Sequence, residues 1–219
     1  MLPLFDLNPS RRSPVIVVTF VVANVVVLLV EFATMTHAGT SAFIETWALV
    51  PAALWRSPDT RVWLTPLTSM FLHGGWAHLV GNCWFLWIFG NNIEDRLGHV
   101  LFVVFYALCG LAAAAAQVVV SPHSLVPMIG ASGAISGVLG AYMRYFPRTP
   151  ILTLVPFIIP VLPIPAFVFT LLWFAFQFWQ GVGSLATAGT QAGVAWWAHV
   201  GGFIAGFFLA GLMRPTRGR

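Results

Sequence analysis

The sequence predicts an all-α integral membrane protein, a bundle of six transmembrane helices with a long outer loop between the first and the second. Of the 219 residues, 59% are hydrophobic and only 7% are charged, and the mean hydropathy of +0.89 lies far outside the range of soluble domains. Apolar stretches of about 20 residues recur, and a helix of that length crosses the hydrocarbon while satisfying its own backbone hydrogen bonds. These stretches lack the apolar and polar alternation of membrane β-barrel strands.

The six predicted spans follow from the apolar runs and the residues that interrupt them. They lie at about 14–36, 76–92, 98–120, 131–146, 166–181 and 193–213. The first run follows two arginines, as in a signal peptide, but it has no convincing small-residue cleavage site, so we expect a retained helix. One membrane domain is therefore expected over 1–219, with short tails at about 1–13 and 214–219.

The arginines orient the predicted spans. With a cytoplasmic N-terminus, eight of the ten basic residues lie inside, namely Arg11, Arg12, Arg96, Arg144, Arg148, Arg214, Arg217 and Arg219. Only Arg56 and Arg61 remain outside, an asymmetry that fits the excess of positive charge in cytoplasmic loops. Both termini are thus predicted to be cytoplasmic. The segment "FGNNIEDRLGH" then faces the cytoplasm, where we expect Glu94, Asp95 and Arg96 to be solvated.

Four polar side chains are predicted to converge at similar depth near the outer ends of three spans. They are His78 and Asn82 in the second span, Ser132 at the start of the fourth and His199 near the start of the last. His78 and Asn82 are four residues apart and share a helix face. Polar groups at membrane depth are costly and face protein or a water-filled cavity, so this agreement in depth indicates a common site.

Small residues predict which helices bring these groups together. Gly202, Gly206 and Ala210 continue the face headed by His199, and Gly133, Gly137 and Ala141 form a matching ridge after Ser132. Such ridges let membrane helices approach closely. If the two ridges cross, Ser132 and His199 come within reach of each other.

A serine beside a neutral imidazole favours nucleophilic catalysis. His199 can take the hydroxyl proton of Ser132, and the oxyanion formed by attack on a carbonyl can be stabilised by His78, Asn82 and the backbone N–H of Ser132. No acidic residue is expected near this site, because Glu31 lies in the first span and the other acids near spans lie on the opposite side. The pattern therefore predicts a two-residue dyad.

Each of these residues also has an ordinary structural explanation. Small residues such as Ser132 commonly serve helix packing, His199 could bond a carbonyl, and Asn82 could join two helices. No metal site is expected, since an HExxH motif is missing and His73 and His78 are five residues apart. Cys83 and Cys109 lie in apolar runs and are interpreted as small buried side chains.

These motifs resemble those of the rhomboid intramembrane serine proteases. Gly130, Ala131, Ser132 and Gly133 are similar to the family's G-x-S-G motif. His73, His78 and Asn82 are similar to its H-x4-H-x3-N pattern. Ala198, His199 and Gly202 are similar to its A-H-x-x-G pattern in the final helix. The segments "LTSMFLHGGWAHLVGN" and "FGNNIEDRLGHVLFVVFYALCG" also look like bacterial rhomboids, so the resemblance runs from about residue 60 to the C-terminus.

The resemblance implies a six-helix rhomboid-like core with a cavity open to the outside. It also implies a role for each residue of the site. Ser132 would be the nucleophile, His199 the general base and acid, and His78 and Asn82 the oxyanion-stabilising residues, with His73, Gly130, Gly133, Gly202 and Gly206 in supporting positions. The implied reaction is hydrolysis of membrane-anchored protein substrates near the outer ends of their spanning helices, without a cofactor. The implied location is the plasma membrane of a bacterium, with an organelle membrane as the alternative. The implied partners are the lipid bilayer and membrane proteins; nucleic acid is not expected, and no oligomeric state is predicted.

Two positions depart from the family pattern. Thr65 stands where the family's outer-loop Trp-Arg pair would place its arginine, and Ser136 stands where some members have a tyrosine that packs on the catalytic histidine.

Two other functions are alternatives to proteolysis. A client-binding protein without catalysis would normally have lost the serine or the histidine, and a transporter would be expected to show internal repeats.

Overall fold

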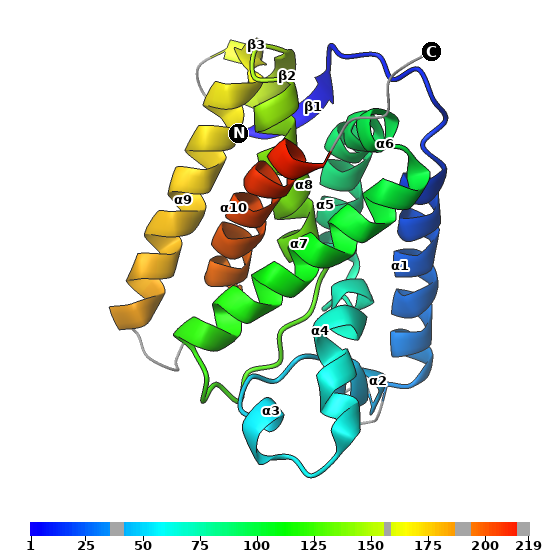
Figure 1. Cartoon of the computed structure of the whole chain (residues 1–219), viewed down its shortest axis with the longest axis vertical. Coiled ribbons are helices and arrows are strands. Elements are labelled where there is room, and N and C mark those ends of the chain that lie inside the picture. The colour runs from blue at the N-terminus through cyan, green and yellow to red at the C-terminus, as the bar shows by residue number, and fades with distance from the viewer. Residues whose placement is uncertain (36–41, 156–158, 187–193, 214–219) are drawn as a thin grey trace.

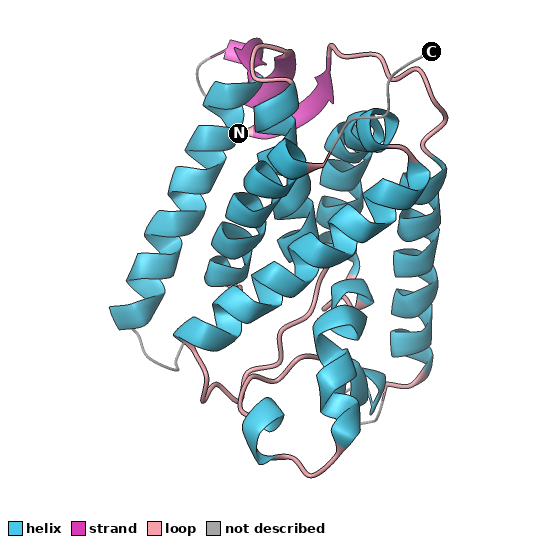
Figure 2. Cartoon of the chain, viewed as in Figure 1, coloured by secondary structure: helices cyan, strands magenta, loops and turns pink. Residues whose placement is uncertain are grey.

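The computed structural model describes residues 1–35, 42–155, 159–186 and 194–213, and within them the chain forms a helical bundle with a small sheet at one end (Figures 1 and 2). The longer helices are α1 (Val15–Ala33), α5 (Trp76–Phe85), α6 (Asn91–Leu97), α7 (His99–Val120), α8 (Ser132–Tyr145), α9 (Ala166–Ala186) and α10 (Trp196–Leu212). A π-helical turn, Leu86–Gly90, joins α5 directly to α6. The second predicted span therefore belongs to a continuous helical stretch that runs past residue 92.

Short helices fill the segment between the first two long ones. These are α2 (Ala42–Trp47), α3 (Ala53–Arg56), a 3-10 turn at Thr60–Leu64, α4 (Thr65–Thr68) and a second 3-10 turn at Ser69–Phe71. They gather at the end of the bundle opposite the sheet (Figure 1). Within this segment Trp55 and Trp63 are both exposed and pack edge to face, with ring centroids 6.4 Å apart. Thr65 is buried and donates its hydroxyl to the carbonyl of Val62.

Every predicted span contains a helix, but the helices differ in their ability to cross a bilayer alone. Among the described residues, α1, α7 and the stretch Ala166–Leu185 of α9 are long and apolar enough to do so, and α10 is a shorter apolar helix. Their outward faces carry exposed Val, Leu, Phe and Trp side chains, as lipid contact requires. The chain is thus a multi-pass membrane protein.

The prediction of an all-α fold was wrong at one end of the bundle. Strands β1 (Leu2–Asp6), β2 (Pro150–Val155) and β3 (Ile159–Pro165) form an antiparallel sheet in that order. The proline-rich sequence of β2 and β3 cannot continue as a helix, because proline lacks the N–H and clashes with the preceding turn. Strand β1 comes from the N-terminal residues that were expected to form a tail.

Three side-chain hydrogen bonds fasten the N-terminal strand to the bundle. The Asp6 carboxylate accepts hydrogen bonds from the Tyr142 hydroxyl of α8 and from Asn92 Nδ2 at 2.7 Å, and Trp84 Nε1 donates to the Pro3 carbonyl at 2.7 Å. Burial raises the pKa of Asp6, against the opposing effect of the Tyr142 hydrogen bond. The sheet is therefore tied to the same helix that begins with Ser132.

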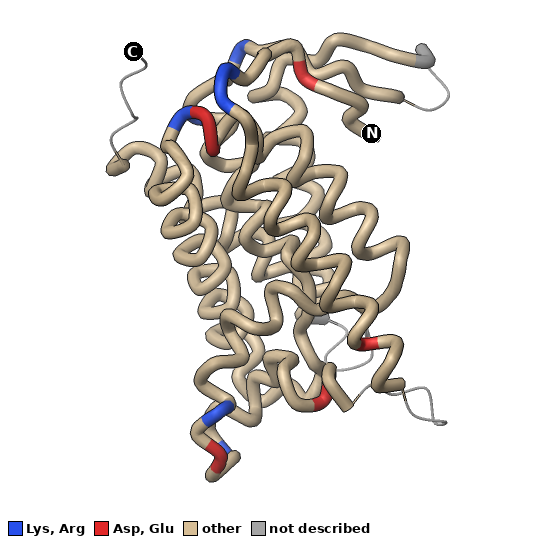
Figure 3. The backbone as a smooth tube through the Cα atoms, turned by 90° about the vertical axis from the view of Figure 1, so that its right-hand side faces the viewer, with Lys and Arg blue, Asp and Glu red and all other residues tan. Residues whose placement is uncertain are grey.

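In the part of the chain that the structure describes, the charged residues gather toward the two ends of the bundle (Figure 3). The expectation that Glu94 is solvated was wrong, since only 1% of this residue is exposed. Its carboxylate accepts hydrogen bonds from the backbone N–H groups of Ile16 and Val17 at 2.8 and 2.9 Å and contacts His99 Nδ1 at 2.6 Å. A carboxylate from α6 thus satisfies the otherwise unpaired N–H groups in the first turn of α1.

Replacing Glu94 with alanine is expected to lower the free energy of unfolding by about 2–4 kcal/mol, because it leaves two N–H groups of α1 without an acceptor. The measurement is equilibrium unfolding in detergent. Asp95→Ala is the matched control, because Asp95 accepts from the exposed backbone N–H groups of Arg11 and Arg12, where water can substitute. Equal losses in the two variants would contradict the capping role of Glu94.

The predicted crossing of two small-residue ridges is confirmed. A Cβ added to Gly202 of α10 would lie 2.0 Å from the Gly133 carbonyl oxygen of α8, and one added to Gly206 would lie 2.0 Å from that of Gly137. The backbones of α8 and α10 are therefore in direct contact along their length. This contact sets the separation of the residues that begin the two helices.

Candidate active site

The start of α8 is shaped by a glycine that no other residue can replace without strain. Gly130 has φ +117°, and a Cβ there would lie 2.7 Å from His78 Nε2. Its N–H donates to the Ser69 carbonyl at 2.9 Å, which holds the loop against the second 3-10 turn. No side chain of the described residues caps the first turn of α8, so the N–H of Ser132 stands at a helix start without a side-chain cap.

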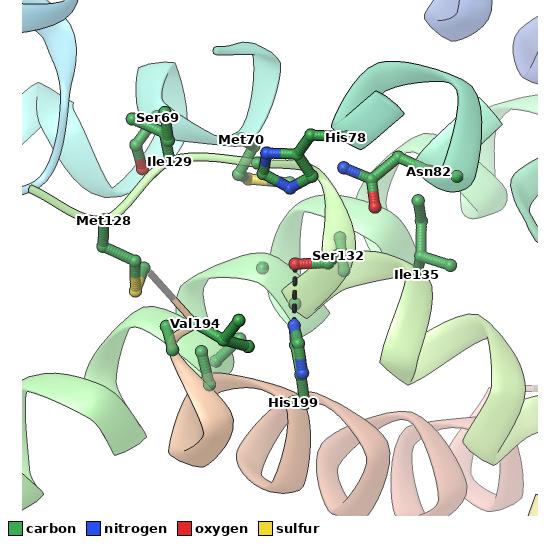
Figure 4. Close-up of a pocket in the computed structure, with 18 of the residues that line it drawn as sticks. Ser69, Met70, His78, Asn82, Met128, Ile129, Ser132, Ile135, Val194 and His199 are labelled. Atoms are coloured by element: carbon green, nitrogen blue, oxygen red, sulfur yellow. Dashed lines mark hydrogen bonds between the residues drawn. The ribbon is translucent and has the colours of Figure 1, made fainter. Parts of the chain in front are cut away.

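Ser132 and His199 meet where α8 and α10 begin (Figure 4). His199 Nε2 lies 2.8 Å from Ser132 Oγ, a hydrogen-bond distance between side chains 67 residues apart in sequence. His199 is 9% exposed and belongs to the first turn of α10. The pair has the geometry that a serine and its general base require.

His78 and Asn82 face Ser132 from the side opposite His199 (Figure 4). Both project from α5, and Asn82 is 7% exposed. Among the described residues, Asn82 Nδ2 has no hydrogen-bond acceptor. His78 Nδ1 accepts from the Gly74 N–H at 3.4 Å, so the hydrogen of the neutral ring belongs on Nε2. Two side-chain donors therefore lie beside the serine.

A cavity of about 520 Å³ joins these groups. Ser132, His199, His78 and Asn82 all line it, and most of its other lining residues are apolar. Contributions come from α4, the second 3-10 turn, α5, α7, the loop before α8, α8 itself, α9 and α10. The four residues predicted to converge from three spans thus share one cavity.

His73, the remaining histidine of the motif, lies behind His78 instead of beside Ser132. Its backbone N–H donates to Glu31 Oε1 at 3.0 Å, its Nδ1 lies 3.1 Å from the Phe71 carbonyl, and its ring packs edge to face against His78 with centroids 5.2 Å apart. His73 therefore positions the loop and the His78 ring. Glu31, from α1, contacts this supporting histidine.

Gln177 of α9 was missed by the sequence analysis. Its side-chain oxygen lies 2.7 Å from His199 Nδ1, so both ring nitrogens of the histidine are engaged. Two tryptophans flank the same ring, Trp173 with centroids 6.0 Å apart and Trp196 at 6.2 Å and a perpendicular angle. The available signal was a pair of glutamines, Gln177 and Gln180, within an otherwise apolar run, because a polar side chain at membrane depth needs a partner.

The two cysteines lie apart from this chemistry. Both are free thiols, with Cys109 buried and Cys83 half-buried. Cys109 packs against α8, since a Cβ on Gly137 would lie 2.5 Å from its sulfur.

Ser136 has a structural contact within α8, because its hydroxyl donates to the Ser132 carbonyl at 2.6 Å.

Comparison with known proteins extends the likeness over most of the chain. A family model described as a Rhomboid domain matches residues 60–216. The chain belongs to the rhomboid family. This rhomboid is 41% identical over 81 residues to the rhomboid protease GluP of Bacillus subtilis, an alignment that covers 37% of this chain and 15% of GluP.

Further relatives share longer alignments. This rhomboid is 30% identical over 135 residues to the putative rhomboid protease YdcA of Bacillus subtilis, covering 58% of this chain and 61% of YdcA. It is 29% identical over 158 residues to the mouse mitochondrial presenilin-associated rhomboid-like protein, covering 69% of this chain and 39% of that protein. The chain thus spans less than two thirds of the length of each relative.

Proposed function

We propose that this rhomboid is an intramembrane serine endopeptidase that hydrolyses peptide bonds in or near the spanning segments of membrane-anchored proteins. The observation that carries the proposal is the 2.8 Å contact between Ser132 Oγ and His199 Nε2 inside a cavity of a multi-pass membrane protein. GluP is named a rhomboid protease and YdcA a putative rhomboid protease, which supports the same reaction class.

In the proposed mechanism Ser132 is the nucleophile and His199 is the general base and acid. The serine hydroxyl donates its proton to Nε2 as Oγ attacks the substrate carbonyl carbon, forming a tetrahedral intermediate. The imidazolium then returns the proton to the leaving nitrogen, the C–N bond breaks, and an acyl-enzyme remains. Water, deprotonated by the same nitrogen, attacks the ester and releases the acid and Ser132.

The negative oxygen of the intermediate needs donors that are in place beforehand. Asn82 Nδ2 and His78 Nε2 lie on the side of Ser132 opposite His199, and the uncapped N–H of Ser132 adds a backbone donor. The Asn82 amide, which has no acceptor among the described residues, supports this role, because a buried donor without an acceptor is costly and a role in catalysis would account for it. Donors fixed around the developing charge are commonly the largest single contribution to such catalysis.

We further propose the membrane arrangement of the whole chain, as a single domain with six spans over 1–219 and both termini in the cytoplasm. The arginines Arg11, Arg12, Arg96, Arg144 and Arg148 belong to the end that carries the sheet and α6, which supports placing that end inside. Ser132 and His199 then lie toward the outer side, in the plasma membrane of a bacterium. Substrates would enter from the bilayer and be cut near the outer ends of their helices.

Asn82→Ala is expected to lower kcat about 100-fold while KM changes little, because the amide acts on the intermediate more than on the bound substrate. The measurement is steady-state cleavage of a labelled single-span substrate in detergent. Asn24→Ala is the control, as it removes a buried amide from α1 that does not line the cavity. A rise in KM with unchanged kcat would contradict oxyanion stabilisation by Asn82.

The test of the proposed function uses the full chain in liposomes with several single-span substrates of different helix stability. We expect cleavage within or near the outer end of the spanning segment, located by mass spectrometry of both products. A fluorophosphonate should phosphonylate Ser132, displace fluoride and stop cleavage. Retention of uncut substrates together with an unreactive Ser132 would refute proteolysis and favour the client-binding function.

A further inference from the structure

The histidine of the proposed dyad is held at both ring nitrogens, and the second partner lies on a helix that carries none of the four predicted residues. His199 Nε2 is 2.8 Å from Ser132 Oγ, and Nδ1 is 2.7 Å from Gln177 Oε1. Gln177 is 6% exposed, so water has little access to replace this contact. The ring is thus fixed between α8 and α9.

The chemistry of the two contacts selects one tautomer of the neutral ring. An amide oxygen can only accept, so the hydrogen of the imidazole must sit on Nδ1. The lone pair on Nε2 then faces the Ser132 hydroxyl, as a general base requires. The other tautomer would place a lone pair against the amide oxygen and a hydrogen toward the serine, where it could not take a proton.

The same bond stabilises the state that forms when Ser132 attacks. Once Nε2 has taken the proton, the ring is a cation, and its Nδ1–H becomes a charge-assisted donor to the amide oxygen. Such bonds are roughly twice as strong as bonds between neutral groups. Gln177 therefore favours both the productive resting ring and the charged intermediate.

Helix α9 presents a second group to the same ring. Trp173 lies four residues before Gln177, on the same helix face, and its ring centroid is 6.0 Å from that of His199. Trp196 closes on the ring perpendicularly at 6.2 Å. The two tryptophans therefore flank the His199 ring. Ser136, one turn after Ser132 in α8, is a small residue whose hydroxyl bonds the backbone of its own helix.

We propose that Gln177 is a positioning residue, which holds His199 in the tautomer that can deprotonate Ser132. The proposal rests on the proposed protease function for its catalytic consequence, but its structural core, the Nδ1–H bond to an amide oxygen, can be measured without substrate. It makes α9 a part of the catalytic apparatus and extends the dyad to a third side chain that bears no charge.

The experiment compares Gln177→Leu, which keeps the volume but removes the acceptor, with Gln177→Glu, which keeps an acceptor. Gln177→Leu is expected to lower kcat about 10- to 100-fold, the value of a buried hydrogen bond, with KM within about twofold. Gln177→Glu is expected to recover most of the lost kcat. The matched control is Gln117→Leu on α7, whose side chain does not line the cavity.

A second measurement reads the tautomer directly. Nitrogen-15 NMR of histidine-labelled full-length protein distinguishes a protonated from an unprotonated ring nitrogen, and the His199 signals are those lost in His199→Ala. We expect a hydrogen on Nδ1 in the wild type and in Gln177→Glu, and a shift of the population toward Nε2 in Gln177→Leu. An unchanged tautomer in Gln177→Leu, or equal kcat losses in the Leu and Glu variants, would overturn the proposal.

The two readouts separate this proposal from the proposed function. If the wild type cuts no substrate, proteolysis fails while the NMR result still decides the role of Gln177. If the wild type is active and Gln177→Leu retains its full kcat, the positioning role fails and the protease function stands.

Discussion

Ser132→Ala and His199→Ala are each expected to reduce the cleavage rate about 10⁴- to 10⁶-fold, to the level that the oxyanion donors and substrate binding sustain alone. The reason is that Ser132 and His199 are in direct contact at 2.8 Å, an arrangement that the other hydroxyl and imidazole of the cavity, Ser69 and His78, do not reproduce: Ser132 supplies the attacking oxygen and His199 moves its proton. Because the two act as one unit, the double variant should be no slower than either single variant. Cleavage of a labelled single-span substrate by equal amounts of folded protein is the measurement.

Ser136→Ala is the matched control for this prediction. Ser136 stands one turn after Ser132 on the same helix and is fully buried, but its hydroxyl donates a hydrogen bond to the Ser132 carbonyl. Its loss should change the rate only a few-fold, about the effect of one neutral hydrogen bond. Cleavage that survives Ser132→Ala, or that falls equally in Ser136→Ala, would refute Ser132 as the nucleophile.

Gly202→Ala is expected to have the next largest effect, about 100-fold on the cleavage rate with about 1–3 kcal/mol lost from the free energy of unfolding. The added methyl group would lie 2.0 Å from the Gly133 carbonyl oxygen, so α10 must move away from α8 by more than 1 Å to reach ordinary contact near 3.4 Å. His199 is three residues before Gly202 and moves with it. The contact between Nε2 and Ser132 Oγ is then stretched beyond a hydrogen bond.

The measurement for Gly202→Ala combines cleavage kinetics with equilibrium unfolding in detergent. Gly183→Ala in α9 is the control, because a Cβ there meets nothing within 4 Å and the same change of helix propensity occurs without a clash. We expect Gly183→Ala to be as active and at least as stable as the wild type. A Gly202→Ala protein with wild-type kinetics would show that the close approach of α8 and α10 does not set the geometry of the dyad.

Local patterns were enough to predict the helices and four of the residues around the cavity. Apolar runs near the length of a bilayer mark where helices form, and glycines at helical spacing mark the faces that can touch, because only residues without side chains let two backbones meet. Ser132 and His199, 67 residues apart, could therefore be paired from the two ridges that begin beside them. The full sheet escaped prediction because its edge strand β1, which pairs with β2, comes from the far end of the chain.

By itself, then, the sequence determined that this chain is a membrane-embedded helical protein of the rhomboid type with a serine and a histidine on facing ridges. The tertiary structure alone decided the partners of groups that have no periodic signal. Glu94 turned out to cap α1, and Gln177 of α9 turned out to bond His199. Such contacts depend on how whole helices are placed, and a single polar side chain in an apolar run shows that a partner is needed without showing which one.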